Sequence, residues 1–535
     1  MQVKRARFPL KSVQLLHLIL CLFASILILL ISAKALNRAP WMDELMLYSN
    51  YPVESISASL HPLRLYDQAA TPVYSLVYGW TAGLPTVFIR AFHLWTISFV
   101  SVVILSYREK TAKSVLLAAI IITSFPRSFY YMMEMKHYGL EIIGAMGVVS
   151  LFMAGNVSNM LRPSSTLIFL AFTFLGISTL PLGGVIGFAL LGLVALRCRG
   201  LRRNQVISIL TIVFVLMLYF LVIKNITVFQ MANYPRSYSS LGFVGNARRV
   251  LSIVSSLVPG GNFGRLAMVG SFLILVVLSR DNSSLKRLCL VLVIVVPIYM
   301  ILAGLGMYPA FSTRHVVWFS GLMWMLVYHS TIPFVAESAL YIQSPDVLKR
   351  LMSIAAFSIA VFFSFQSFLS LNEISRNSTE QDTSLAIDYI RNHPTLKVGL
   401  YGAAQPMMDF YSKEYRDLRN RRVFGVLNSQ SASALSGVPG SATEITVDAE
   451  RPGAWARLWQ RKSDYQQHFL ETLDKAPEGE EFLLLAYWTG WLGQQDGGRE
   501  HRLSGEELSI AEENDCSMLE HIDFGSADVY RVYCR

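Results

Sequence analysis

Long apolar runs separated by short basic segments dominate the first 370 residues of the chain. The run Val13 to Ala33 is about as long as a helix that crosses the roughly 30 Å hydrocarbon core of a bilayer. Four basic residues precede this run: Lys4, Arg5, Arg7 and Lys11. By the positive-inside rule they place the N-terminus in the cytoplasm. The run exceeds the h-region of a signal peptide, so we interpret it as a retained first helix.

Keeping every basic loop on the cytoplasmic side gives eleven spans, with the C-terminus outside. In chain order these predicted spans are 13–33, 90–107, 114–125, 139–154, 164–180, 184–196, 205–223, 267–278, 288–305, 316–329 and 351–369. A long first outer loop, 37–89, remains, and its apolar stretch 71–88 is expected at the membrane interface because Pro72 and Pro85 interrupt it. The sequence thus predicts an α-helical polytopic membrane protein.

After residue 370 the pattern changes to short helices and strands. We expect helices at 382–392 and 405–411 and strands at 397–401 and 481–487, which predicts a small α/β domain outside the cytoplasm. The expected domains are therefore 1–370, a membrane domain, and 371–535, a soluble domain. Cys516 and Cys534 are the only cysteines of the second domain and flank an expected hairpin, so they are a candidate disulfide in an oxidising compartment.

Composition and charge support this division. The chain is 53% hydrophobic and 15% charged, whereas an ordinary soluble domain has about 25% charged residues. Residues 1–370 hold 10 of the 36 acidic and 29 of the 46 basic residues. The positive net charge therefore reflects cytoplasmic loops and not a nucleic-acid partner. The five cysteines show no zinc-ligand spacing, so any metal would need carboxylate ligands.

Six of the ten acidic residues of the membrane half lie in or beside the first two outer loops. They are Asp43, Glu44, Glu54, Asp67, Glu134 and Glu141. Asp43 and Glu44 lie a short distance beyond the first helix, although Asp43 could instead cap a helix at 44–60. If the second loop is helical, Glu134, Tyr138 and Glu141 share one face. A carboxylate at the mouth of a membrane helix usually faces a wet cavity, but Glu134 could also form a surface ion pair with Lys136.

Cationic side chains are expected on the same side of the membrane. Arg314 and His315 follow Tyr308 in a late outer loop, against the positive-inside bias, and Arg90 and Lys224 lie at the outer ends of their helices. Each of these side chains could simply extend toward lipid phosphate. Together with the carboxylates, however, they offer a proton acceptor and a binding site for an anionic leaving group.

Several short motifs resemble, in the same order, those of the GT-C glycosyltransferases, in the branch of protein O-mannosyltransferases and the lipid A aminoarabinose transferase. The motifs are Trp41-Met42-Asp43-Glu44, Thr71-Pro72-Val73-Tyr74-Ser75-Leu76, Arg90, Glu134-Met135-Lys136-His137-Tyr138, and Tyr308-Pro309 with Arg314-His315. Thr71 stands where the family often has a second proline. Lys136 replaces the usual arginine, so it would contact phosphate as a point charge and not through the two parallel hydrogen bonds of a guanidinium group.

The resemblance implies a role for each matching residue. Asp43 would be the general base or orient the acceptor, Glu44 would support it, and Glu134 would be the second acid of the site. The expected donor-phosphate ligands are Lys136, Arg314, His315 and Arg90, with weaker substrate contacts from Tyr138, Glu141 and Tyr308. The implied reaction is an inverting transfer of a sugar from a polyprenyl-phosphate donor to a glycan, lipid or protein acceptor at the outer face of the plasma (inner) membrane. No cofactor is required, because cations can stabilise a monophosphate leaving group; a divalent metal is allowed but not predicted.

Two other functions fit parts of the pattern. A transporter or flippase of lipid-linked sugars would use the same cations to hold its substrate, and an O-antigen ligase-like enzyme would use a similar membrane architecture. A transporter is expected to carry acidic groups at mid-membrane and to show inverted repeats. In this sequence the outer acids lie at the membrane rim apart from Glu141, and no internal repeat is evident.

Overall fold

The computed structural model describes the greater part of both halves of the chain. The described residues are 10–36, 42–50, 63, 72–78, 81, 84–153, 242–257, 283–305, 313–336, 383–402, 404–419, 421–425, 462–487, 503, 505–524 and 527–535, with short helical pieces between 206 and 231 and between 361 and 372. The chain divides into two compact units. Unit 1 comprises 1–36, 90–221 and 236–375, and unit 2 comprises 37–89, 222–235 and 376–535.

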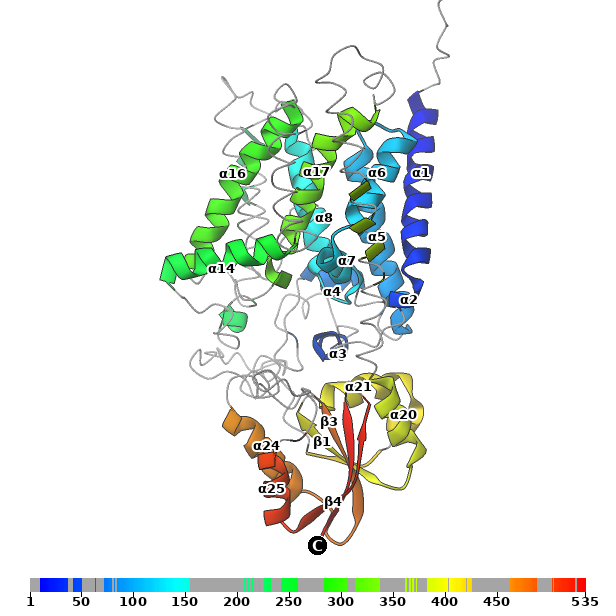
Figure 1. Ribbon diagram of the computed structural model, residues 1–535, viewed down its shortest axis with the longest axis vertical. Helices are drawn as coiled ribbons and strands as arrows, with labels where there is room; N and C mark the ends of the chain where they lie inside the picture. The colour runs from blue at the N-terminus through cyan, green and yellow to red at the C-terminus, as the bar shows by residue number, and fades with distance from the viewer. Residues whose placement is uncertain are drawn as a thin grey trace, which may run out of the picture. The chain divides into compact units, whose positions relative to one another are not determined.

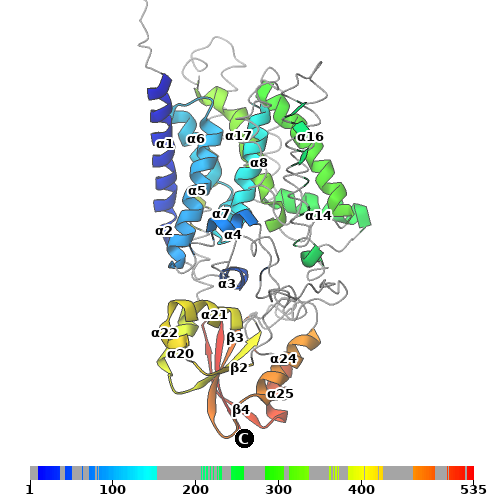
Figure 2. The same ribbon diagram turned by 180° about the vertical axis from the view of Figure 1, so that it is seen from behind.

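Unit 1 is a helical bundle (Figures 1 and 2). Its elements are α1 (Leu10–Ile31), α2 (Ala33–Leu36), α5 (Thr86–Ser106, which begins just before the division), α6 (Ala112–Thr123), α7 (Pro126–Met133), α8 (Tyr138–Met153), α14 (Gly242–Leu257), α16 (Ser283–Gly304), the 3₁₀ turn η3 (Thr313–Val316) and α17 (Trp318–Ala336). Helix α17 packs against α6, α8 and α16, and α1 packs against α6. The bundle therefore brings together helices that are distant in sequence.

Helix α1 shows the surface expected of a membrane helix. Its exposed side chains are large and apolar, such as Phe23 and Leu30, whereas its small and polar residues His17, Cys21 and Ser25 are buried toward the bundle. His17 Nε2 lies 2.9 Å from Ser106 Oγ on α5. Lipid solvates apolar side chains and cannot hydrogen-bond polar ones, so this distribution matches a bilayer environment.

Among the described residues, three helices are long and apolar enough to cross a membrane: Val13–Ile31, Thr86–Ser106 and Leu285–Gly304. A fourth span results if α6 and α7, which are bent by 89° at their junction, count as one. These helices match predicted spans at 13–33, 90–107 and 288–305. The predicted spans 164–180, 184–196 and 267–278 lie outside the described residues, so the total of eleven stays a prediction.

Two glycines allow α8 to approach its neighbours closely. A Cβ at Gly139 would lie 2.0 Å from Cδ1 of Ile97 on α5, and a Cβ at Gly321 on α17 would lie 2.5 Å from Cγ of Met146 and 2.9 Å from the carbonyl oxygen of Ile142. Close approach at small residues is a common basis of helix association in membranes, where water supplies no hydrophobic drive between helices. Gly139 and Gly321 thus position α8 against α5 and α17.

We expect Gly321→Ala to destabilise unit 1, because the added methyl group meets the fixed backbone of α8. Overpacking of this kind costs about 1–3 kcal/mol of unfolding free energy. Thermal unfolding of the purified protein in detergent would measure the change as a lower melting temperature. Gly505→Ala is the matched control, since a Cβ there meets nothing within 4 Å. Equal melting temperatures for the two variants would contradict the close packing at Gly321.

The C-terminal part of unit 2 is an α/β domain, as predicted. Its elements are α20 (Ser384–Asn392), β1 (Lys397–Gly402), α21 (Ala404–Glu414), α22 (Arg416–Arg419), β2 (Val423–Phe424), α24 (Lys462–Asp474), β3 (Glu481–Tyr487), α25 (Gly505–Glu513), β4 (Cys516–Asp523) and β5 (Asp528–Cys534). The sheet order is β2-β1-β3-β5-β4, with β1, β2 and β3 parallel and β5 antiparallel to both β3 and β4.

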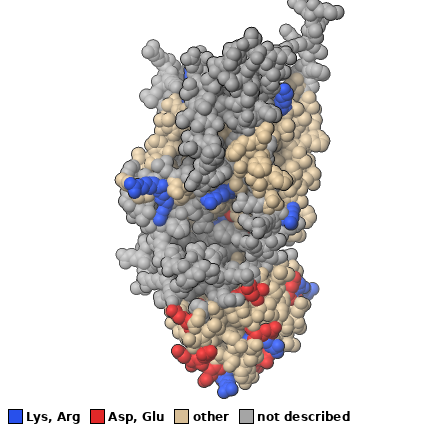
Figure 3. Space-filling view, viewed as in Figure 1, with Lys and Arg blue, Asp and Glu red and all other residues tan. Residues whose placement is uncertain are grey.

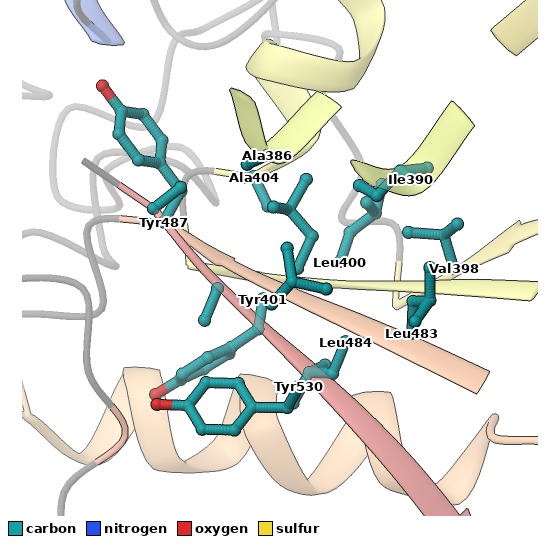
Figure 4. Close-up of a cluster of buried hydrophobic side chains, with 14 of the residues drawn as sticks. Ala386, Ile390, Val398, Leu400, Tyr401, Ala404, Leu483, Leu484, Tyr487 and Tyr530 are labelled. Atoms are coloured by element: carbon teal, nitrogen blue, oxygen red, sulfur yellow. The ribbon is translucent and has the colours of Figure 1, made fainter. Parts of the chain in front are cut away.

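Helices cover both faces of this sheet. Helices α20 and α21 lie on one face, and α24 and α25 lie on the other (Figures 1 and 2). Strands β2 and β3 lie on either side of β1, so the connection from β1 to β2 and the connection from β2 to β3 run in opposite directions across the sheet. Right-handed crossovers in opposite directions place their helices on opposite faces. The central strands are consequently buried on both sides, with Leu400, Leu483 and Leu484 in the core (Figure 4).

The first outer loop contributes to this same core. Helix α3 (Met42–Tyr48) packs against α21, and its residues Leu45 and Met46 belong to the hydrophobic cluster of the α/β domain. Helix α4 (Pro72–Tyr78) adds Tyr74, whose hydroxyl donates to the hydroxyl of Tyr48 at 3.4 Å. The segment 37–89 therefore belongs with residues 376–535 in space, although the sequence grouped it with the membrane domain.

Cys516 and Cys534, the candidate disulfide pair, are bonded to each other. They lie opposite each other in the register of β4 and β5, so the bridge joins the start of one strand to the end of the next. Carboxylates gather on the surface of this domain (Figure 3), in agreement with the 26 acidic residues that follow residue 370.

A buried histidine of this domain has a lowered pKa. The ring of His468 on α24 donates from Nε2 to the carbonyl oxygen of Gly425 at 3.0 Å, and burial lowers its pKa despite that hydrogen bond. A histidine with a lowered pKa in the folded state stabilises the protein above its unfolded pKa of about 6.5, and this stability is lost as the pH falls below that value.

We therefore expect the melting temperature of unit 2 to fall between pH 7.5 and pH 5.5, and to fall less in His468→Gln, which has no charge to gain. Circular dichroism of the purified protein at the two pH values would measure the difference. An equal loss in wild type and variant would contradict the assignment to His468.

Candidate active site

The second outer loop is not one helix. Helix α7 begins at Pro126 and ends at Met133, Glu134 has an extended backbone (ψ 141°), and α8 begins at Tyr138. The prediction that Glu134, Tyr138 and Glu141 share one helical face is therefore wrong. Proline at the first helical position starts α7 favourably, and its abrupt 89° turn from α6 directs the chain across the end of the bundle. The motif 134–138 forms the bend between α7 and α8.

Helix α5 fixes this bend from one side. Arg90 and His93 are three residues apart and so share a side of α5, and both are fully buried. The Nδ1–H of His93 donates to the carbonyl oxygen of Glu134 at 2.8 Å. Glu134 is itself only 1% exposed. Burial of a charged side chain is costly unless hydrogen bonds or opposite charges offset its loss of hydration. The bend is therefore a buried polar site and not a surface loop.

The remaining residues of the motif surround Tyr138. The ammonium of Lys136 lies 5.9 Å from the centre of the Tyr138 ring, within the range of a cation–π contact. Nε2 of His137 lies 3.3 Å from Oε1 of Glu141, four residues later. Glu141 lies in the first turn of α8, where the helix dipole favours a negative charge. All four residues are buried, which gives this polar cluster a low local dielectric.

The late outer segment lies beside the second one. The hydroxyl oxygens of Ser128 on α7 and Ser320 on α17 are 2.5 Å apart, and η3 directly precedes α17. Arg314 and His315 are residues of η3, and His315 is half-buried. Unit 1 therefore places α7, which precedes Glu134, against α17, which follows Arg314. The side chain of Arg314 and the whole of Tyr308 lie outside the described residues.

Helix α14 connects these segments and was not predicted from the sequence. It packs against α7, α16 and η3 and lies crosswise to α16 (Figure 1). Its two adjacent arginines, Arg248 and Arg249, add positive charge beside the outer segments. The sequence does carry a signal for this helix, an amphipathic pattern in which Val250 and Leu257 are buried and Val244 is exposed. The positive-inside rule, however, left residues 224–266 as a loop between two predicted spans.

The acid pair of the first outer loop lies in unit 2. Asp43 and Glu44 occupy the first turn of α3, and Glu44 is fully buried. The alternative in which Asp43 caps a helix at 44–60 is wrong, because α3 already begins at Met42 and ends at Tyr48. Asp43 is thus inside the helix, and its side chain lies outside the described residues.

Three further side chains of the site were not singled out from the sequence. His93 holds the backbone of Glu134, His137 pairs with Glu141, and Ser128 links α7 to α17. Two of them had a signal in the sequence: His137 is part of the motif 134–138, and His93 lies one helical turn after Arg90. Within the described ranges, no group of three or more histidine, cysteine, aspartate or glutamate side chains is arranged to hold a metal ion.

The polar cluster can support transfer chemistry on an anionic substrate. Arg90 and Lys136 supply buried positive charge near the bend, and Glu134 and Glu141 supply buried carboxylates. Preorganised cations in a buried site stabilise developing negative charge more strongly than they do in water. The cluster therefore suits a reaction that releases an anion such as a phosphate monoester.

No family model matches the sequence, and no curated protein sequence is significantly similar to it. Among solved structures, ArnT from Cupriavidus metallidurans in the apo state is similar over 95% of this chain and 97% of its own, with 13% identity and a TM-score of 0.50. The same protein bound to undecaprenyl phosphate is similar over 96% and 97%, with 12% identity and a TM-score of 0.54. The chain therefore has the fold of ArnT, which confirms the GT-C fold that the order of its motifs indicated.

Proposed function

We propose that this protein is an integral membrane glycosyltransferase that moves a sugar from a polyprenyl-phosphate donor to an acceptor at the outer face of the inner membrane. The observation that carries this proposal is the set of buried polar side chains at the bend between α7 and α8, with Glu134 and Lys136 in the bend and Arg90 one turn from His93, which holds the Glu134 backbone, in a chain whose fold is similar to that of ArnT bound to undecaprenyl phosphate. The acceptor is a glycan, a lipid or a protein.

The proposed reaction is one displacement at the anomeric carbon. Asp43 accepts the proton of the acceptor hydroxyl as its oxygen attacks, the bond between the anomeric carbon and the phosphate oxygen breaks, and the configuration inverts. The electron pair of the broken bond remains on polyprenyl phosphate. Lys136, Arg314, His315 and Arg90 stabilise this dianion, and Glu134 is the second acid of the site. Tyr138, Glu141 and Tyr308 contact the substrate more weakly.

The proposal is tested by following both products. Purified protein is incubated with radiolabelled lipid-linked sugars extracted from the host membrane and with an envelope fraction as acceptor. We expect the label to move to the acceptor while polyprenyl monophosphate accumulates in equal amount. Release of polyprenyl diphosphate would contradict a monophosphate donor.

The same assay in sealed vesicles separates an enzyme from a flippase. A flippase would move intact sugar lipid between leaflets and release no polyprenyl phosphate. That result, obtained with folded protein, would replace the transferase proposal.

A further inference from the structure

Helix α3 is too short to be stable alone. It has seven residues, whereas isolated helices below about 12–15 residues are marginal in water. Its helical form, and with it the direction of the acids in its first turn, must therefore come from the contacts that surround it. Those contacts come from α4 and from α21 of the C-terminal domain, both in unit 2.

The side of α3 that faces the domain is apolar. Leu45 and Met46 are 0% and 1% exposed and lie in the same hydrophobic cluster as Met407 and Tyr411 of α21. This contact orients the helix about its own axis, because a rotation would take Leu45 and Met46 out of the cluster that they share with α21. Asp43 and Glu44 directly precede these two residues in α3, so the same packing fixes the helical backbone that carries them.

The C-terminal end of α3 is held by hydrogen bonds. Nζ of Lys413, in the last turn of α21, donates to the carbonyl oxygen of Ser49 at 2.7 Å and to that of Tyr48 at 3.3 Å. The Ser49 hydroxyl donates to the Leu45 carbonyl at 2.7 Å, and the Asn50 amide donates to the Met46 carbonyl at 2.8 Å. A cation at this position satisfies carbonyls that the helix leaves without partners and complements the negative end of its dipole.

We propose that Lys413 is a positioning residue for the reaction: through it and α21, the C-terminal domain sets the orientation of α3 and hence of Asp43 and Glu44. This inference rests on the proposed function, and it gives the C-terminal domain a part in catalysis without contact with the substrate. It assigns to Lys413 an effect on turnover and not on donor affinity, because the predicted donor-phosphate ligands lie on other elements.

The test compares Lys413→Met, which keeps the alkyl chain but loses both hydrogen bonds, with Lys413→Arg, which keeps a cation and its donors. In Lys413→Met we expect kcat to fall about tenfold or more with little change in the donor KM, since small misplacements of a catalytic group are costly. Lys413→Arg should recover most of the lost kcat. Lys475→Met, which removes an exposed lysine of the same domain, is the control and should match wild type.

Hydrogen exchange of the full-length variants supplies an independent readout. In Lys413→Met we expect faster exchange of the amides at 45–50, with unchanged protection in β1 and β3. If kcat is unchanged, or if it falls while the α3 amides stay protected, the inference is wrong. If Lys413→Met loses protection throughout the domain, Lys413→Arg becomes the deciding variant. Its failure to restore both kcat and the protection of the α3 amides would also overturn the inference. Absence of transfer by wild-type protein would instead count against the proposed function.

Discussion

Asp43→Asn is expected to reduce sugar transfer by about 100-fold to 10,000-fold, the range that general acid–base groups contribute. Asparagine keeps the shape of aspartate and its place in the first turn of α3, but it cannot accept the proton of the acceptor hydroxyl. Because the substitution leaves Leu45 and Met46 and their packing against the C-terminal domain in place, expression and thermal stability should remain near wild type. Initial rates of label transfer at saturating donor measure the effect.

Asp67→Asn is the matched control, since Asp67 lies in the same first outer loop but has no assigned role. It should retain wild-type rates. Full activity of the Asp43 variant would remove this residue from the mechanism and leave Glu44 or Glu134 as the proton acceptor.

Arg90→Met is expected to lower kcat/KM for the lipid donor by about 100-fold or more, as loss of one preorganised donor to a developing anion does in other enzymes. The Arg90 side chain is fully buried on α5, one turn from the histidine that holds the Glu134 backbone. Arg90→Lys should recover part of the activity, because lysine keeps the charge but lacks the planar fork that binds two phosphate oxygens. Steady-state kinetics with varied donor concentration measure both variants.

The control for Arg90 is Arg127→Met, which removes an exposed arginine from α7 in the same outer region. We expect no more than a small change there. Equal losses in the two variants would show that total positive charge, and not a specific phosphate contact, accounts for the effect of Arg90.

Local patterns in the sequence predicted the regular elements well. The span at 90–107 corresponds to α5 and that at 288–305 to α16, because uninterrupted apolar runs of this length have few alternatives. The strand Glu481–Tyr487 was predicted with the bounds it has, since a parallel strand covered on both faces is apolar throughout.

Three features depended on contacts between distant parts of the chain and could not be predicted in the same way. The backbone at Glu134 is extended, and His93 of α5 donates a hydrogen bond to its carbonyl oxygen. Helical periodicity along 126–141 does not reveal a contact with a helix so distant in the sequence. Helix α14 is stabilised by packing on α16 and η3. The attachment of α3 to α21 joins Tyr48 and Ser49 to Lys413, more than 360 residues later. Lys413 donates to backbone carbonyl oxygens, which every residue has, so the side chains at 48 and 49 do not indicate the contact.

The central claim is that the outer polar cluster holds the phosphate of a polyprenyl lipid, and photo-crosslinking tests it most directly. Wild-type protein is illuminated with undecaprenyl phosphate that carries a photoreactive group beside the phosphate, and the labelled peptides are identified by mass spectrometry. We expect labelling of the segments that hold Arg90, 134–141 and 313–316, with competition by undecaprenyl phosphate and none by undecaprenol. Labelling confined to other segments, or equal competition by undecaprenol, would contradict the account.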